Sequence, residues 1–349
     1  MPTAPTAPPE SRARGEARCL LCHSPALVPL YAGVRDRLRY VPGDREWWRC
    51  RACGSAVLVP QPRPDELPGF YPPVYSFTPE LGKKSRLANW LARLEYHFFF
   101  RPQYLTQVRR VMRCTGAAGR GWRLLDIGCG RGLRLLELRG LGYEVHGLDI
   151  QPDVVRYLRE ELNIPAVCAG VEAAEEFYPP GSFDVVTAFY LMEHINDVTG
   201  FLRACYRLLR PGGWVAVAIP FADSIQAGLF GGRWINVTEA PRHLSLPTQK
   251  GALFAVRRAG FERARILPDS VINCAGQIGS SMIPGSTLTH AYGKPGLRAF
   301  VPRFVGAAVT LVALPFCLAE NYAAGKPSLG IVCARKPDHP GPADGDVSA

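Results

Sequence analysis

The sequence predicts an α/β protein in which a mostly parallel sheet carries helices on both faces. Five strand-like apolar runs alternate with helical patterns between Arg123 and Pro220, as expected of successive βαβ units. A glycine-rich turn, Gly128-Cys129-Gly130-Arg131-Gly132, follows the first run, and an acid, Asp149, ends the second. Ligands of such sheets bind outside the carboxyl ends of the strands. We therefore expect a ligand site where this turn meets Asp149.

The size and composition of the chain allow one such domain with additional elements. Its 349 residues are 47% hydrophobic and carry a formal net charge of +11. An anionic substrate, a membrane surface or nucleic acid could use this charge, but an arginine-rich cytoplasmic surface also explains it. Because basic residues do not alternate with aromatic ones, nucleic-acid binding is not expected. Residues 1–17 predict a disordered leader rather than a signal peptide, and residues 337–349 predict a disordered tail.

Four of the eleven cysteines form two C-x-x-C pairs, Cys19 with Cys22 and Cys50 with Cys53. The pairs are separated by 27 residues, and such tight turns aim four thiolates at one tetrahedral Zn²⁺. Four thiolates leave no open coordination position, so this metal would be structural. We therefore predict a zinc ribbon over residues 18–60. The other seven cysteines are expected to be reduced, buried and singly placed.

A connector and helices are expected over residues 61–115, between the ribbon and the first strand of the sheet. The connector contains the aromatic sequence Phe70-Tyr71-Pro72-Pro73-Val74-Tyr75. These aromatic residues would dock the ribbon on the main domain or line a groove for an acceptor. Apolar residues at helical spacing predict helices between Leu87 and Met112.

The chemistry of the glycine-rich turn favours a nucleoside ligand. Glycines let a ligand lie against the backbone, and a carboxylate at Asp149 can accept hydrogen bonds from both hydroxyls of a ribose. A dinucleotide site is the obvious competitor, but the glycine spacing is G-x-G-x-G and not G-x-G-x-x-G. Asp126, just before the turn, would repel a pyrophosphate, whereas it suits a ligand that carries an ammonium group.

At these residues the chain resembles the class I S-adenosylmethionine-dependent methyltransferases. Three further matches follow Leu125–Gly132 in the expected order, at Phe183–Phe189, Glu193-His194 and Leu208–Gly213. The resemblance implies a Rossmann-like, seven-stranded sheet over residues 116–336, helices before it that cover the ligand as a lid, and S-adenosylmethionine as cofactor. It also implies the following cofactor-binding residues: Asp126, Gly128, Cys129, Gly130, Gly132, Asp149, Ile150, Glu172 and Phe189.

The last two strands form a hairpin in that family, whereas this chain carries an insertion between them. We expect the sixth strand at Phe261–Leu267, the seventh at Ser328–Arg335, and an insertion over about residues 269–326. Within it, sixteen uncharged residues at 304–319 are interrupted by Pro315. This run is short for a membrane span. A buried or dimer-forming helix and a peripheral membrane contact through residues 299–320 both stay open.

Three residues are candidates for the chemistry of methyl transfer. His194 is the leading general base because imidazole titrates near neutrality, although it could merely order its loop together with Glu193. The second candidate is His243, in a segment after the fifth strand where Arg242 could hold an anionic group. Some relatives in ubiquinone biosynthesis bind a divalent metal through acids before the Glu-His pair. No acid stands there in this chain, so that site is not expected; the residues are Tyr190, Leu191 and Met192.

The chain is also similar to bacterial zinc-ribbon methyltransferases of glycan and lipid-linked saccharide biosynthesis. The shared features are the ribbon, the connector, the segment Pro241-Arg242-His243 and the apolar stretch at 304–319. This resemblance implies O-methylation of a sugar, a lipid-linked glycan or another small hydroxylated metabolite by a cytoplasmic enzyme. Peripheral contact with the inner face of the membrane stays open. A ribosomal RNA methyltransferase that grips RNA with its ribbon and a non-catalytic cofactor-sensing or scaffold protein are the competing functions. The sequence does not set the oligomeric state.

Overall fold

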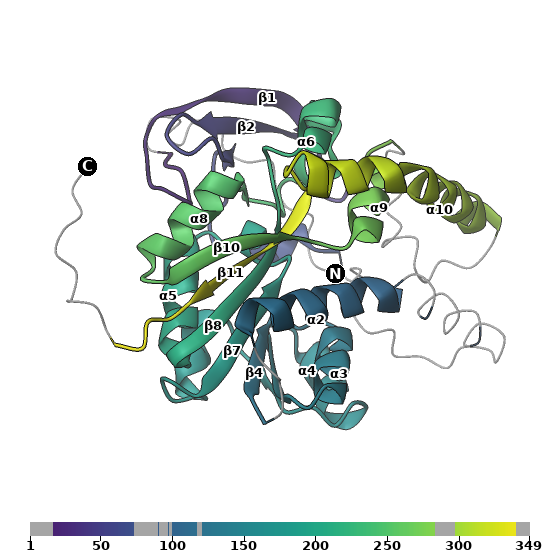
Figure 1. Cartoon of the computed structure of the whole chain (residues 1–349). Helices are drawn as coiled ribbons and strands as arrows, with labels where there is room; N and C mark the ends of the chain where they lie inside the picture. Colours follow the sequence, from purple (N-terminus) through teal and green to yellow (C-terminus); the bar gives the residue numbers. More distant parts are fainter. Residues whose placement is uncertain are drawn as a thin grey trace.

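The computed structural model contains a central sheet of seven strands in the order β10-β11-β8-β7-β4-β5-β6. Helices cover both of its faces (Figure 1). The inner strands are parallel, whereas β11 runs antiparallel to both of its neighbours. This order and the terminal hairpin confirm the predicted class I methyltransferase sheet. The structure describes residues 17–72, 90, 97, 100–116, 121–282 and 297–339, with only the backbone at 297–304 and 307.

The strands and helices alternate along the main domain as the sequence predicts. The strands of the sheet are β4 (Arg123–Ile127), β5 (Glu144–Asp149), β6 (Ala166–Cys168), β7 (Phe183–Phe189), β8 (Leu209–Pro220), β10 (Glu262–Pro268) and β11 (Leu329–Arg335). The helices packed on them are α2 (Arg101–Thr115), α3 (Leu133–Gly140), α4 (Pro152–Glu160), α5 (Val198–Leu208) and α8 (Gln249–Arg258).

Two apolar layers hold the sheet between its helices. One layer joins the sheet to α5 and α8 through residues such as Phe201 and Val256. The other joins it to α2, α3 and α4 through residues such as Val108 and Leu135. Strands covered on both faces bury continuous apolar runs, and β7 from Val185 to Phe189 is buried at every position. The core therefore holds the carboxyl ends of the parallel strands in a fixed arrangement.

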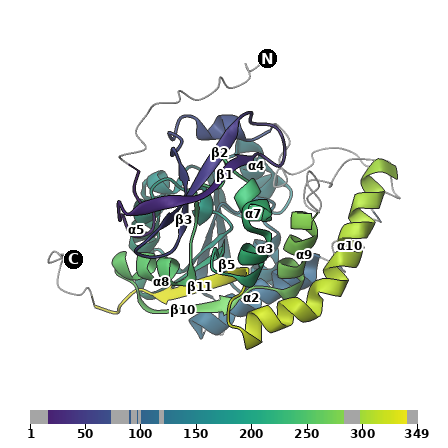
Figure 2. The same ribbon diagram turned by 90° about the horizontal axis from the view of Figure 1, so that it is seen from above.

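The N-terminal residues form a second sheet, which the main domain completes. Its strands β1 (Leu27–Arg35), β2 (Asp44–Cys50) and β3 (Ala56–Val59) are antiparallel, and β9 (Ser245–Leu246) pairs with β3 as a fourth strand. Figure 2 looks onto this sheet from above, at one end of the larger sheet. The ribbon region and the segment after β8 are thus parts of one structure.

The insertion before the last strand forms two helices, α9 (Val271–Met282) and α10 (Leu297–Leu318), and α10 continues as the π-helix η6 (Ala319–Ala323). The helices cross closely, and a Cβ added at Gly279 would lie 3.4 Å from the carbonyl oxygen of Gly306. The prediction that Pro315 interrupts this run is wrong. A proline removes one intrahelical hydrogen bond, and packing of α10 on α9 sustains the helix. Across the described residues, we find no helix that could cross a membrane.

Two predictions about the single cysteines are wrong. Cys114 at the end of α2 and Cys333 in β11 form a disulfide, a pairing that their separation of 219 residues conceals in the sequence. Cys168 is exposed because β6 is the edge strand of the sheet. The remaining single cysteines are buried as predicted: Cys129, Cys205, Cys274 and Cys317.

Several predictions concern residues outside the described ones. Residues 1–16 of the leader and 340–349 of the tail are among them. So are most residues between 73 and 99, where the lid helices are predicted to begin. Helix α2 is the described part of that helical region.

Candidate active site

The glycine-rich turn links β4 to α3 at the carboxyl edge of the sheet. Gly128, Gly130 and Gly132 all have positive φ angles, between 49° and 68°, which strain residues that carry a Cβ. Steric crowding is a second reason for glycine at position 128, because an added Cβ would lie 3.1 Å from Cδ2 of Leu191. The N–H of Gly128 donates to the carbonyl of Leu148 at 2.7 Å and ties the turn to β5. The predicted strand, turn and helix are therefore present.

Asp149 ends β5 beside this turn. Its carboxylate accepts hydrogen bonds from the N–H groups of Gly130 and Gln151, each at 3.0 Å. Burial raises the pKa of this carboxyl. The next residue, Ile150, leaves 71% of its surface exposed, so its apolar side chain is available to a ligand. Together these groups offer a carboxylate, a bare backbone and an apolar face.

The remaining predicted cofactor residues surround the turn in different ways. Asp126 is only 2% exposed and accepts a hydrogen bond from the hydroxyl of Thr187 at 2.7 Å. Burial raises the pKa of Asp126 to about 6. Phe189 is buried beneath the guanidinium of Arg134, 4.5 Å from its ring centre. Cys129 is buried in the turn, and Glu172 is exposed in η3 (Val171–Glu176), which follows β6.

Glu193, His194 and His243 come together in one cluster. A carboxylate oxygen of Glu193 and one ring nitrogen of each histidine lie within 4.8 Å of one another. The first two residues belong to η4 (Met192–His194), after β7, and His243 lies in the loop between α7 (Ile235–Thr238) and β9. The N–H of Leu244 donates to the carbonyl of Glu193 at 2.7 Å and fixes this approach. The three predicted catalytic residues therefore share one location.

Hydrogen bonds define the protonation of both histidines. Nδ1 of His194 lies 3.0 Å from the carbonyl oxygen of Arg242, and Nδ1 of His243 lies 2.8 Å from that of Asn236. Since a carbonyl only accepts, each Nδ1 carries a proton and each Nε2 keeps a lone pair. Burial lowers the pKa of both imidazoles to about 3 and keeps them neutral. Burial also raises the pKa of Glu193 to about 8.

Arg242 does not face a ligand, which contradicts the prediction that it holds an anionic group. Its guanidinium is fully buried and bonds the carboxylates of Asp36 and Glu239. Asp36, its partner in the ribbon region, is 206 residues away in the sequence, so sequence patterns could not indicate this ion pair. The connector does reach the cluster, because the hydroxyl of Tyr71 lies 3.0 Å from Nδ1 of His194.

A buried polar network beside the cluster has no counterpart among the sequence predictions. Tyr190, directly after β7, has a positive φ of 57°, and its hydroxyl donates to the carboxylate of Asp269. The amides of Gln107 and Asn273 donate to the same oxygen at 2.9 and 3.0 Å. These residues come from α2, α9 and the ends of two strands. Only the place of Tyr190 after the fourth strand could have indicated a role at this edge.

The four ribbon cysteines form a compact sulfur cluster. Sγ of Cys19 lies 3.6 Å from that of Cys53, and Sγ of Cys22 lies 3.5 Å from that of Cys50. All four sulfurs lie within 4.8 Å of one another. Sulfurs bound to Zn²⁺ at about 2.3 Å would be about 3.8 Å apart in a tetrahedron. The donor set and its spacing therefore fit the predicted structural zinc.

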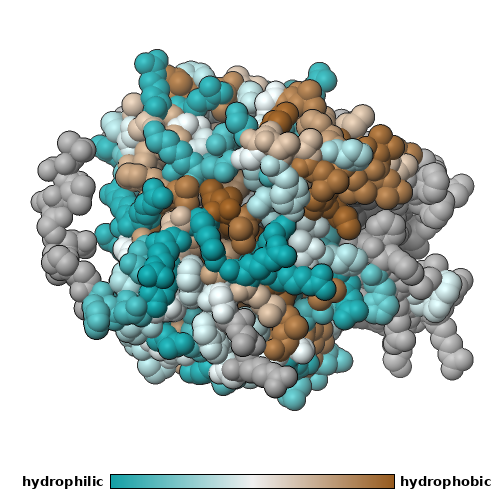
Figure 3. All heavy atoms as spheres, viewed as in Figure 1, coloured by the Kyte–Doolittle hydropathy of each residue, from teal (hydrophilic) through white to brown (hydrophobic). Residues whose placement is uncertain are grey.

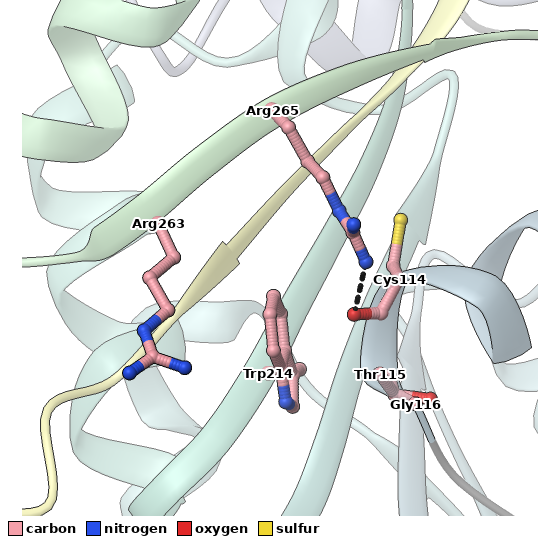
Figure 4. A pocket seen from close by; sticks show the side chains of 6 residues that line it. All are labelled: Cys114, Thr115, Gly116, Trp214, Arg263 and Arg265. Atoms are coloured by element: carbon pink, nitrogen blue, oxygen red, sulfur yellow. Dashed lines mark hydrogen bonds between the residues drawn. The ribbon is translucent and has the colours of Figure 1, made fainter.

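A surface hollow of about 370 Å³ lies away from these groups (Figure 4). It is lined by the end of α2, by Trp214 of β8, and by Arg263 and Arg265 of β10. The guanidinium of Arg265 donates to the carbonyl of Cys114 at 2.7 Å. The hollow is at the opposite end of β8 from the carboxyl edge and is not part of the candidate site.

The sheet order, the positive-φ turn and the acid at the end of β5 together define a nucleoside-binding domain of the class I methyltransferase type. The family model described as methyltransferase domain matches residues 90–264, half of the chain. The chain belongs to this family, whose class I members use S-adenosylmethionine as cofactor.

Curated relatives match the central part of the chain. The ubiquinone biosynthesis O-methyltransferase of Burkholderia vietnamiensis is 35% identical over 144 residues, which cover 39% of this chain and 60% of the relative. The enzyme of the same name from Thiobacillus denitrificans is 34% identical over 143 residues, which again cover 39% of this chain and 60% of the relative. The chain thus matches about three fifths of the length of these relatives.

Solved structures with similar folds include two methyltransferases. Phosphoethanolamine N-methyltransferase 2 of Haemonchus contortus, in complex with S-adenosyl-L-methionine, has a TM-score of 0.47 and 19% identity, covering 76% of this chain and 61% of that one. A possible histamine N-methyltransferase of Thermotoga maritima has a TM-score of 0.44 and 16% identity, and the match covers 72% of this chain and 97% of that one.

Proposed function

We propose that the protein transfers a methyl group from S-adenosylmethionine to a hydroxyl oxygen of a small acceptor, such as a sugar or a lipid-linked glycan. One observation carries this proposal: two neutral imidazoles and a carboxylate converge after β7, next to the predicted cofactor site. An alcohol is a weak nucleophile until its proton is removed. The matched relatives are named O-methyltransferases, which supports an oxygen acceptor.

The residues at the carboxyl edge fit the cofactor. Asp149 would accept hydrogen bonds from the ribose hydroxyls, and the exposed Ile150 would lie against the adenine. Asp126 and the backbone of the glycine-rich turn would hold the amino-acid end. When bound, S-adenosylmethionine supplies an electrophilic methyl group on its sulfonium. The protein then needs only to align the acceptor and take its proton.

The Glu193–His194–His243 cluster is the part of the protein that we assign to proton removal. Both Nε2 atoms keep lone pairs because both Nδ1 atoms donate to backbone carbonyls. The hydroxyl of Tyr71 in the connector also contacts Nδ1 of His194, on the same side of the ring as the carbonyl of Arg242. The cluster is therefore positioned to act on an acceptor held at this edge.

The surface of α10 supports a lipid-linked acceptor. Apolar side chains gather over α10 in the upper right of Figure 3, which has the same view as Figure 1. Large apolar residues of α10 are exposed there: Val305, Leu311, Val312, Phe316 and Leu318. Contiguous exposed apolar surface is typical of contact with lipid or another partner.

Methyl-labelled S-adenosylmethionine, incubated with the purified protein and fractionated bacterial extract, tests the proposal. We expect label in the lipid or glycan fractions. Label in ribosomal RNA would instead establish the competing nucleic-acid function. Label in no fraction, from protein that binds the cofactor, would support a cofactor-sensing role.

A further inference from the structure

The Glu193–His194–His243 cluster brings one carboxylate oxygen and one ring nitrogen of each histidine within 4.8 Å of one another. Glu193 is 1% exposed, and its Oε2 has no hydrogen-bond partner among the described residues. A buried carboxylate oxygen without a partner costs free energy. The two Nε2 atoms also offer lone pairs, because the carbonyls of Arg242 and Asn236 hold both Nδ1 protons. A cation would satisfy all three groups at once.

We infer that Glu193, His194 and His243 bind one divalent transition-metal cation of the zinc class. Two imidazoles and one carboxylate form a ligand set that open zinc sites use, with a further position left for a substrate or water. Ligand atoms around such an ion, at about 2.1 Å, would be about 3.4 Å apart. The three side chains already lie within 4.8 Å, so small side-chain movements would complete the site.

The surroundings of the cluster have the form that supports metal ligands. Metal-binding histidines donate their other ring N–H to a carbonyl or carboxylate, which fixes the orientation of the ring, and both histidines do so here. The backbone hydrogen bond from Leu244 to Glu193 holds the two segments together. Arg242, next to His243, is fixed by its carboxylate partners. The ligands are therefore preorganised.

This ligand set differs from that of some relatives in ubiquinone biosynthesis, which bind a metal through acids before the Glu-His pair. The residues before Glu193 offer no acid, and a metal was therefore not expected at the Glu-His pair. His243 supplies the third ligand from a segment that follows the next strand of the sheet. Sequence spacing could not show that the two segments meet.

The use of this ion rests on the proposed function, whereas its binding does not. A divalent cation lowers the pKa of an oxygen that it binds. An acceptor hydroxyl at the open position would lose its proton to solvent water more readily. The resulting alkoxide oxygen would form a bond to the methyl carbon as the carbon–sulfur bond breaks, and the sulfonium would leave as a neutral thioether. The cluster would then activate the acceptor through the ion and not by accepting the proton itself.

Metal analysis of the untagged full-length protein tests the inference. We expect two equivalents of zinc per chain, one at the ribbon and one at the cluster. Glu193→Gln and His243→Gln should each lose one equivalent, while His146→Gln, a half-buried histidine far from both sites, should lose none. X-ray absorption should show a mixed shell of sulfur and nitrogen or oxygen in the wild type, and sulfur alone in the His243→Gln protein.

Titration with Zn²⁺ of protein that keeps its ribbon zinc, after a chelator has removed metal only from the non-sulfur site, supplies an affinity. His243→Gln should weaken Zn²⁺ binding at the non-sulfur site by more than about 100-fold. Loss of a group that only hydrogen-bonds to a metal ligand typically weakens metal binding by about 10–100-fold. If X-ray absorption of the wild-type protein shows only sulfur around zinc, and added Zn²⁺ does not change this, the inference is overturned. Glu193 would then carry a proton. Methyl transfer by protein that holds metal only at the ribbon would leave the proposed function standing. Bound metal without methyl transfer would leave only the site.

Discussion

The guanidinium of Arg242 lies 2.5 Å from the carboxylate of Asp36, and both side chains are fully buried. This pair joins the loop after β1 to the segment that carries His243. Since the carbonyl of Arg242 also accepts from Nδ1 of His194, the pair helps to set the geometry of the Glu193–His194–His243 cluster. The ribbon region is therefore a structural support of the site.

Loss of this buried pair should destabilise the protein strongly. Arg242→Met leaves the buried Asp36 without its ion-pair partner, whereas Glu239 keeps Arg37, and a buried charge without its partner costs about 3–5 kcal/mol. Arg35→Met removes an exposed pair with Asp44 and should cost at most about 1 kcal/mol. Urea unfolding of both variants measures the difference. Equal losses in the two variants would contradict the support role.

Removal of a cluster histidine should impair turnover more than cofactor binding. His243→Gln is expected to lower kcat by at least about 100-fold, the scale of lost acid–base catalysis, because one group that activates the acceptor is gone. The KM for S-adenosylmethionine should change little, since the cofactor residues are untouched. Steady-state kinetics beside the His146→Gln control checks this. An unchanged kcat would remove His243 from the mechanism.

Removal of one ribbon sulfur should release the structural zinc. Cys53→Ser takes one of four thiolates from a closed site, and Thr248, the N-cap of α8, donates to the carbonyl of Cys53. The variant should therefore lose the sulfur-bound zinc and unfold at a lower temperature. Cys168→Ser alters an exposed thiol and serves as control. Full zinc content in the Cys53→Ser protein would show that the cluster is not a four-thiolate site.

The raised pKa of Asp126 predicts that the cofactor-free protein loses stability as the pH rises. This carboxyl has an ordinary value of 3.8 and titrates near 6 in the folded protein. Between these values the folded protein holds a proton that the unfolded chain has lost. The stability from this proton is full below about pH 4 and is lost as the pH rises through 6.

Asp126→Asn should therefore raise the free energy of unfolding by roughly 3 kcal/mol at pH 7.5 and by much less at pH 4. Urea unfolding at both pH values checks this difference. Asp65→Asn is the control, because that exposed carboxyl has its pKa lowered by the hydrogen bond from Arg63. A gain for Asp126→Asn that is equal at the two pH values would contradict the assignment.

Local patterns were enough to predict the sheet and the cofactor turn. The glycines at 128, 130 and 132 mark a turn that needs positive φ angles, and the apolar runs mark strands that alternate with helices, as in a parallel sheet. Asp149 could be placed because the last residue of β5 must lie beside that turn. Gly130 and Asp149 are 19 residues apart, and each predicted helix follows its strand directly, so the sequence displays these relations.

Relations between distant segments could not be predicted in the same way. The burial of Arg242 depends on Asp36, and the network of Tyr190 depends on Asp269, which follows β10. The disulfide of Cys114 with Cys333 and the pairing of β9 with β3 are of the same kind. Each requires the tertiary arrangement of elements that the sequence separates. The meeting of Glu193 with His243 is the case that matters most for function.

The central claim is that Asp149 and the glycine-rich turn hold S-adenosylmethionine. Calorimetric titration of the full-length protein with S-adenosylmethionine and its demethylated product tests it most directly. We predict saturable binding of one equivalent, weakened at least about tenfold in Asp149→Asn, since hydrogen bonds to a charged group contribute about 1.5–3 kcal/mol, and unchanged in Asp153→Asn, an exposed acid of α4. No heat of binding for the wild-type protein with either molecule would contradict the claim.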